Sequence, residues 1–126
     1  MRALRRSLII GAVLFAAPAL AAEPENWNFQ GQKYLVYFDE TLHEYLSTAC
    51  RDAECGAKNI LAQARTVDIA SLNIPPHAPD GGWHVGARIC KLFGGTVAMA
   101  RDDRGNENSF CIAPDQTLIN LRSLSH

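Results

Sequence analysis

Hydrophobic and polar positions follow two different periods in the first half of the chain. Residues 33–38 (KYLVYF) are rich in aromatic and β-branched side chains and lie between polar residues, which predicts a buried strand. Apolar residues then recur at helical spacing, and Thr41 with Glu44 matches a capping box, so a helix is expected over residues 41–49. The same spacing in residues 57–65 predicts a second amphipathic helix. Together the two helices would form a hairpin.

The second half begins after a break. Residues 74–82 contain three prolines and two glycines, which cannot sustain a helix or an interior strand. Helical spacing returns in residues 84–93, and Gly94-Gly95 should end that helix. Alternating apolar stretches separated by turn residues then predict a three-stranded antiparallel meander, at residues 96–101, 110–113 and 117–124.

These elements predict an α+β fold. Its first part, residues 22–82, would hold the strand, the helical hairpin and the Pro-rich loop. Its second part, residues 83–126, would be a helix packed on the meander. Residues 22–32 are mostly polar, so they are expected to form an irregular leader in which Trp27 and Phe29 are isolated aromatics.

The N-terminus has the pattern of a secretory signal peptide. Three arginines precede an apolar run at residues 8–17, and small residues at Ala19 and Ala21 suit signal peptidase. We therefore expect cleavage near Ala21, a single mature domain at residues 22–126, and a location in the periplasm or outside the cell. A retained anchor is the alternative, but the apolar run is shorter than the roughly 20 residues that span a bilayer.

Charge narrows the classes of partner. Cleavage would leave 9 basic and 13 acidic residues, a net charge of −4. A nucleic-acid-binding domain would instead carry a basic patch, so nucleic acid is not an expected partner. After signal cleavage no stable membrane insertion is expected either.

The four cysteines of the chain are Cys50, Cys55, Cys90 and Cys111. An even number in an exported chain predicts two disulfides, for which three pairings are possible. We expect Cys50–Cys55 and Cys90–Cys111, because the first pair is close in sequence and the second would tie a helix to a strand. A zinc site is the alternative, but the C-x4-C and C-x20-C spacings lack paired C-x2-C knuckles.

Residues 87–95 (ARICKLFGG) and 110–115 (FCIAPD), with the final apolar stretch, resemble a family of small exported bacterial domains of unknown function, sometimes labelled hemolysins. The family pattern is a Cys-bearing helix, a Gly-Gly stop, a polar hairpin, a second Cys and a Pro-Asp-Gly turn before a Trp-containing strand. The matching residues are Cys90, Gly94, Gly95, Cys111, Pro114 and Asp115.

The chain departs from that pattern at several positions. Val85-Gly86 replaces an Asn-Pro, Ile89 an aromatic and Gln116 the turn glycine, and the final strand has no Trp. The resemblance covers only the last third, and it implies a fold for that third without implying an activity. Membrane damage, as the label suggests, would need an exposed basic amphipathic face, and neither helical segment is basic enough.

Several polar groups could carry chemistry, although each has a simpler structural explanation. His77, Asp80 and His84 would lie near the start of a helix, but their spacing matches no known ligand motif. Trp83 beside two glycines could anchor a partner or dock onto the core. Residues 102–108 concentrate oxygen ligands, yet they lack the register of a calcium loop and suit a hairpin turn.

No catalytic motif stands out. The serines have no G-x-S-x-G turn, and all four thiols can pair. The sequence therefore favours a non-enzymatic exported binding protein that is accessory, inhibitor-like or immunity-type, has no cofactor, and contacts another periplasmic or cell-envelope protein. The expected contact residues are Trp83, His84, Arg101, Asp102 and Arg104. The alternative is a small hydrolase or cell-wall-acting enzyme that pairs His84 or His43 with a carboxylate.

Overall fold

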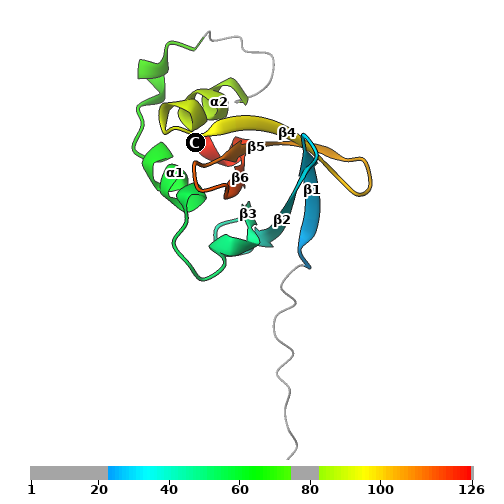
Figure 1. Ribbon diagram of the computed structural model, residues 1–126. Coiled ribbons are helices and arrows are strands. Elements are labelled where there is room, and N and C mark those ends of the chain that lie inside the picture. Colours follow the sequence, from blue (N-terminus) through cyan, green and yellow to red (C-terminus); the bar gives the residue numbers. More distant parts are fainter. Residues whose placement is uncertain (1–22, 75–82, 126) are drawn as a thin grey trace, which may run out of the picture.

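The computed structural model describes residues 23–74 and 83–125, and within them six antiparallel strands close into a barrel with two short helices on one side (Figure 1). The strands are β1 (Glu25–Phe29), β2 (Gln32–Asp39), β3 (Glu44–Ser47), β4 (Thr96–Asp102), β5 (Glu107–Ile112) and β6 (Leu118–Asn120). The helices are α1 (Gly56–Ala64) and α2 (Trp83–Leu92), with 3₁₀ turns η1 (Thr48–Cys50), η2 (Ile69–Leu72) and η3 (Leu121–Leu124). Around the barrel the order is β1-β2-β3-β6-β5-β4, and β4 closes onto β1.

The predicted fold class is wrong. The structure is a closed barrel, not a helical hairpin followed by a helix on a meander. Residues expected to form the first helix contain β3, which pairs with β2 from Asp39↔Glu44 to Val36↔Ser47. Glu44 therefore begins a strand rather than capping a helix. His43, just before it, has a φ of 54°, which is incompatible with a continuing helix.

The expected irregular leader is also a strand. In β1, Trp27 and Phe29 point to the same face of the sheet because side chains alternate along a strand. Gln30 and Gly31 form a two-residue turn with φ values of 49° and 77°, and Phe29 pairs with Gln32 across it. Positive φ at both central residues is the geometry that tight hairpins favour.

Other predicted elements occur where they were expected. Residues 33–38 lie within β2, residues 57–65 correspond to α1, and residues 84–93 to α2. The three later apolar stretches overlap β4, β5 and β6, although β5 begins at Glu107, three residues before the second stretch. The last stretch leaves the sheet early and continues as η3. Gly94 ends α2 with a φ of 81°, and its amide donates to the carbonyl of Lys91. The Pro-rich break lies mostly outside the described residues.

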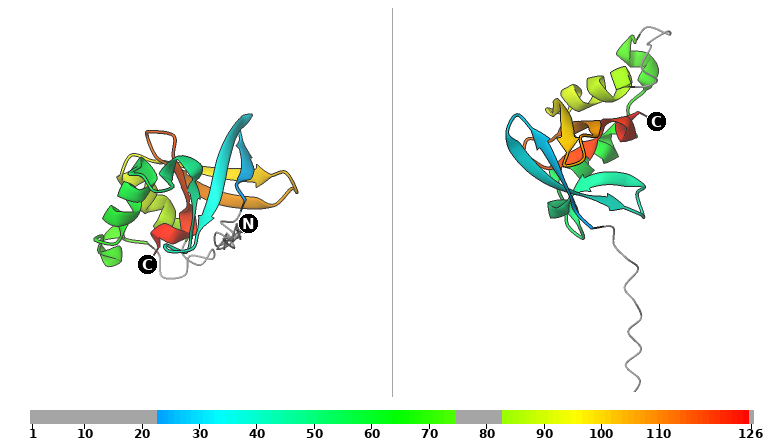
Figure 2. Two further views of the ribbon diagram at one scale, coloured as in Figure 1. Left: turned by 90° about the horizontal axis from the view of Figure 1, so that it is seen from below. Right: turned by 90° about the vertical axis from the view of Figure 1, so that its right-hand side faces the viewer.

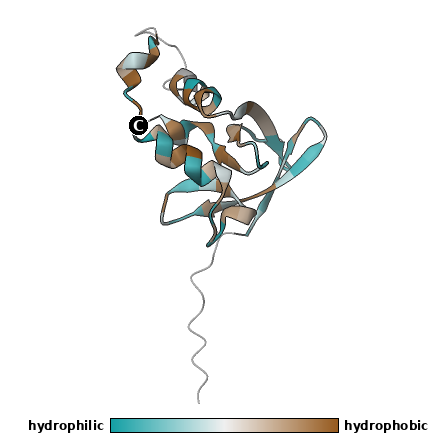
Figure 3. Ribbon diagram, turned by 60° about the vertical axis from the view of Figure 1, so that its left-hand side comes forward, coloured by the Kyte–Doolittle hydropathy of each residue, from teal (hydrophilic) through white to brown (hydrophobic). Residues whose placement is uncertain are grey.

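The barrel encloses its own core. The interior side chains are Trp27, Tyr34, Val36, Ala98, Ala100, Phe110, Ile112 and Leu118. Trp27 meets Phe110 edge to face, with ring centroids 5.2 Å apart. Alanines at positions 98 and 100 of β4 leave room for this aromatic pair. Figure 3 shows hydrophobic stretches along the strands rather than a regular alternation, because β2, β4 and β5 each contain consecutive hydrophobic residues.

A second core lies between the outside of the barrel and the helices. Leu46 and Ile119 face outward from β3 and β6, and both are fully buried beneath this layer. Figures 1 and 2 show α1 and α2 gathered at one side, opposite the tip of the β4–β5 hairpin. Outward-facing positions of these strands are therefore also apolar, which hides the alternation that a one-sided sheet would show.

Both predicted disulfides are confirmed. Cys50 bonds to Cys55, and Cys90 of α2 bonds to Cys111 of β5, so no cysteine is free. Gly95 lies directly against the second bridge, because a Cβ at this position would be 2.6 Å from the sulfur of Cys111. The bridge and the glycine thus fix how closely α2 approaches the barrel. None of the helices in the described ranges is long and apolar enough to span a membrane.

Candidate functional site

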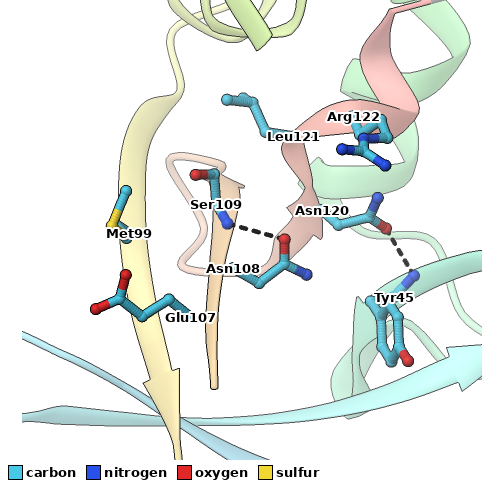
Figure 4. A pocket seen from close by; sticks show the side chains of 8 residues that line it. All are labelled: Tyr45, Met99, Glu107, Asn108, Ser109, Asn120, Leu121 and Arg122. Atoms are coloured by element: carbon cyan, nitrogen blue, oxygen red, sulfur yellow. Dashed lines mark hydrogen bonds between the residues drawn. The ribbon is translucent and has the colours of Figure 1, made fainter. Parts of the chain in front are cut away.

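A hollow of about 530 Å³ opens where β6 ends (Figure 4). β6 has three residues and lies between β3 and β5, whereas β5 extends beyond it through residues 107–109. After Asn120 the chain turns into η3, and Leu121 is buried in the core beneath the helices. The hollow is lined by Tyr45, Met99, Glu107, Asn108, Ser109, Asn120, Leu121 and Arg122.

A second hollow of about 610 Å³ adjoins the first and shares Tyr45, Glu107 and Asn108 with it. It lies between the start of β1 and the β4–β5 hairpin. Its other lining residues are Glu23, Pro24, Glu25, Trp27, Asp102, Asp103, Arg104 and Asn106. We call the two hollows together the lateral groove.

The lateral groove carries an excess of negative charge. Five carboxylates and one guanidinium line its second hollow, and Arg122 adds a second guanidinium in the first hollow. Glu107 also forms an ion pair with Arg101, and both side chains are exposed. An exposed pair of this kind contributes little to stability. The field around the groove therefore favours a positively charged ligand.

Asp102 holds the turn of the β4–β5 hairpin in shape. Its oxygens accept hydrogen bonds from the side chain and the amide of Asn106 and from the amide of Arg104, at 2.8 to 2.9 Å. The hydrogen bond from the Asn106 side chain, with those from the two amides, lowers the pKa of Asp102. The oxygen-rich loop considered as a calcium site thus uses Asp102 to bind its own backbone. Calcium gains no support from this geometry.

Two asparagines organise the first hollow. Asn120 Oδ1 accepts a hydrogen bond from the amide of Tyr45 at 2.8 Å, across a seam where β3 and β6 share one residue pair in register. Asn108 Oδ1 accepts a hydrogen bond from the amide of Ser109 at 2.9 Å. Figure 4 shows both bonds at the wall of the hollow. Side chains here take the place of strand partners for two backbone amides.

The expected contact residues fall into two groups. Arg101, Asp102 and Arg104 lie on the β4–β5 hairpin, and the latter two line the second hollow. Trp83 and His84 begin α2, but their side chains lie outside the described part of the structure. Their contact role stays a prediction. His77 and Asp80 also lie outside the described residues.

A catalytic histidine–carboxylate pair gains no support at His43. This residue lies in the exposed turn between β2 and β3, with its ring centroid 6.3 Å from that of Phe38, and it lines neither hollow. The neighbouring Glu44 is partly buried, and this burial raises its pKa. Across residues 23–74 and 83–125, no group of three His, Cys, Asp or Glu residues could hold a metal ion.

Sequence patterns did not identify Tyr45, Met99, Asn108 or Asn120 as site residues. They belong to no motif, and they come together only because β3, β4, β5 and β6 are neighbours in the barrel. One feature of the strands could have indicated two of these residues. Asn108 and Asn120 are polar residues at strand positions whose neighbours of the same parity, Phe110 and Leu118, are buried inside the barrel.

No family model matches the chain, and neither does any curated protein or solved structure. The resemblance of the last third to small exported domains therefore stays a prediction.

Proposed function

We propose that the protein is an exported binding protein without catalytic activity, and that it holds a positively charged segment of another cell-envelope protein in the lateral groove. The observation that carries this proposal is the set of five carboxylates against one guanidinium around the second hollow. Tyr45 lies between the two hollows and Met99 is 59% exposed at the edge of the first, so a bound segment would also meet apolar surface.

Two features support an exported protein. The N-terminal pattern is that of a signal peptide. The four cysteines form two disulfides, which persist in oxidising compartments outside the cytoplasm. Because all four sulfurs are paired, none of them is available as a nucleophile.

Charge at a groove of this kind sets both affinity and selectivity. A single exposed charge contact contributes about 0.5 kcal/mol, so three of them give roughly tenfold in affinity. Their effect weakens as salt increases, because the Debye length falls to about 8 Å at physiological ionic strength. The proposal therefore requires salt-sensitive binding of basic ligands.

A peptide selection tests this proposal. Random dodecapeptides displayed on phage would be selected against the secreted, disulfide-bonded protein. We expect enrichment of sequences containing Lys and Arg. The triple variant E23Q/D103N/E107Q should bind the enriched peptides roughly tenfold more weakly. The control E40Q/E54Q removes the same kind of charge at exposed positions that line neither hollow, and it should leave affinity unchanged.

Two results would overturn the proposal. One is the absence of any enriched peptide after repeated selection. The other is enrichment of peptides that bind the triple variant as tightly as the unaltered protein, since the groove charges would then play no part in recognition.

A further inference from the structure

The first hollow of the lateral groove has the geometry of a missing strand. β3 and β5 both pair with β6, so where β6 lies between them they are two strand spacings apart, about 9.5 Å. The chain leaves this interval after Asn120 because it turns into η3. Between Tyr45 and residues 107–109, no strand of the described chain fills the space.

Backbone groups of β5 face this interval. The amide of Ala113 donates to the carbonyl of Thr117, at the β6 edge of β5. Along an antiparallel strand the amide and carbonyl groups of successive residues point to opposite edges. Ser109 and Glu107 therefore present theirs to the same edge as Ala113, the edge next to β6. Beside them β6 has ended, and Ser109 donates to the side chain of Asn108 instead. At this position the Ser109 amide is therefore bonded to a short side chain rather than to a neighbouring strand.

The walls of the hollow come from both faces of the sheet. Met99 and Ser109 are partners in register on the outer face of β4 and β5. Asn108 has the parity of Phe110 and points toward the barrel interior, as does Tyr45 of β3. A hollow on one face of a sheet would be lined from that face alone. Lining from both faces is expected at a gap between strands.

We propose that this gap receives an extended, positively charged peptide segment of a partner protein as an added strand beside β5. The segment would lie antiparallel to β5 and to β3, because it continues the line of β6. Its backbone would pair with Ser109 and Glu107, and its basic side chains would lie near the carboxylates of the second hollow. Strand addition gains affinity from main-chain hydrogen bonds and selectivity from alternate side chains.

This inference rests on the proposed function, and it makes a separate claim about how the ligand binds. The most enriched basic dodecapeptide of the selection would be synthesised in three forms. One form is unmodified, and the other two carry N-methyl groups on alternate residues in opposite phase. All three have the same charge. Methylation removes amide donors on one edge of the peptide strand and obstructs pairing there.

We expect at least one methylated form to bind roughly tenfold more weakly than the unmodified peptide, because several main-chain hydrogen bonds are lost together. The unmodified peptide should also slow hydrogen exchange at the Ser109 amide. If all three forms bind equally, or if exchange at Ser109 is unchanged, strand addition is wrong while charge recognition stands. If the selection yields no basic peptide, both proposals fail.

A variant tests the role of Asn108. Its side chain must release the Ser109 amide before a strand can pair there. Asn108→Ala should therefore strengthen binding of the unmodified peptide about threefold. The control Asn26→Ala alters an exposed asparagine on β1 that lines neither hollow, and it should have no effect. Weaker binding by Asn108→Ala, with an unchanged unfolding midpoint, would show that the side chain contacts the ligand directly and would overturn strand pairing at Ser109.

Discussion

The carboxylate of Asp115 lies over the first turn of α1, where its Oδ2 accepts a hydrogen bond from the amide of Gly56 at 2.7 Å. Thr117 acts beside it, because its hydroxyl oxygen accepts from the amide of Ala57 at 2.9 Å and its hydroxyl donates to Asp115. A Cβ at Gly56 would come within 2.6 Å of Asp115 Oδ1, so the glycine permits this approach. The turn between β5 and β6 thus supplies the cap of a helix that is distant in sequence.

Asp115→Asn should lower the free energy of unfolding by about 1 kcal/mol at pH 7, because a negative charge at a helix N-terminus is lost. Desolvation acts to raise the pKa of Asp115, but the hydrogen bonds from Thr117 and from backbone amides outweigh it and lower the pKa. The stabilisation is therefore present above the ordinary aspartate pKa of about 3.9 and is lost as the pH falls through the native pKa.

Urea unfolding at pH 7 and at pH 2.5 would check this prediction. The gap between the unaltered protein and Asp115→Asn should close at the lower pH. Asp103→Asn serves as the control, since this exposed aspartate lies on the β4–β5 hairpin. A gap that persists unchanged at pH 2.5 would mean that the charge is not the source of stabilisation.

Gly95→Ala should destabilise the protein by about 2 to 3 kcal/mol, because the new methyl group would overpack the Cys90–Cys111 bridge. The Cβ would lie 2.7 Å from the Cys90 sulfur. Gly94→Ala is the matched comparison. It has a φ of 81° but only Pro114 at 3.8 Å, so about 1 kcal/mol is expected. In a C90A/C111A background the effect of Gly95→Ala should shrink, and chemical denaturation of the four variants would measure this coupling.

Removing the two disulfides should have unequal effects. In the loop-entropy model, C90A/C111A costs about 3 kcal/mol and C50A/C55A about 2 kcal/mol, because the Cys90–Cys111 bridge closes the longer loop. Thermal unfolding of the two double variants under identical conditions would rank them. The reverse order would show that the short bridge, which joins η1 to the start of α1, organises more of the fold than its loop length indicates.

Tyr37 should lose its proton at a higher pH than a tyrosine in the unfolded chain. Burial, together with the hydrogen bond to Asp39 and the charge of that carboxylate, raises the pKa of Tyr37 to about 12. The folded state therefore keeps this proton after the unfolded chain has lost it near pH 10, so its contribution to stability is full below pH 10 and disappears as the pH rises toward 12. The phenolate absorbance of the protein minus that of Tyr37→Phe, read immediately after a pH jump, should show a midpoint near 12. Asp39→Asn should move that midpoint downward, and an unchanged midpoint would show that Asp39 does not contribute to the raised pKa.

Local patterns predicted the elements whose signals are local. Ile60, Leu61 and Ala64 lie on one buried face of α1, so their spacing identified that helix correctly. In β3 the adjacent Leu46 and Ser47 are both buried, because one faces the helices and the other the barrel interior. The sequence of β3 therefore shows no alternation of apolar and polar residues, and the spacing of the apolar residues in this segment resembles that of a helix.

The barrel itself depends on contacts that no local pattern encodes. β1 joins β4 through Trp27↔Asp102 and Asn28↔Arg101, far apart in the chain. The Gln30-Gly31 turn between alternating aromatics was a local sign of the first hairpin, yet closure requires this distant pairing. The lateral groove follows from closure, so only its hairpin residues Asp102 and Arg104 could be predicted from the sequence.

The Cys90–Cys111 bridge also makes the opening rate of the helix layer measurable. Both sulfurs are fully buried beneath α2, so a small thiol reductant can reach them only while the helix layer is detached from the barrel. When reduction of the transiently exposed Cys90–Cys111 bridge is fast compared with reclosure, the rate at which the thiols of Cys90 and Cys111 appear equals the rate of opening. The rate at which this disulfide is reduced thereby measures how often the helix layer separates from the barrel.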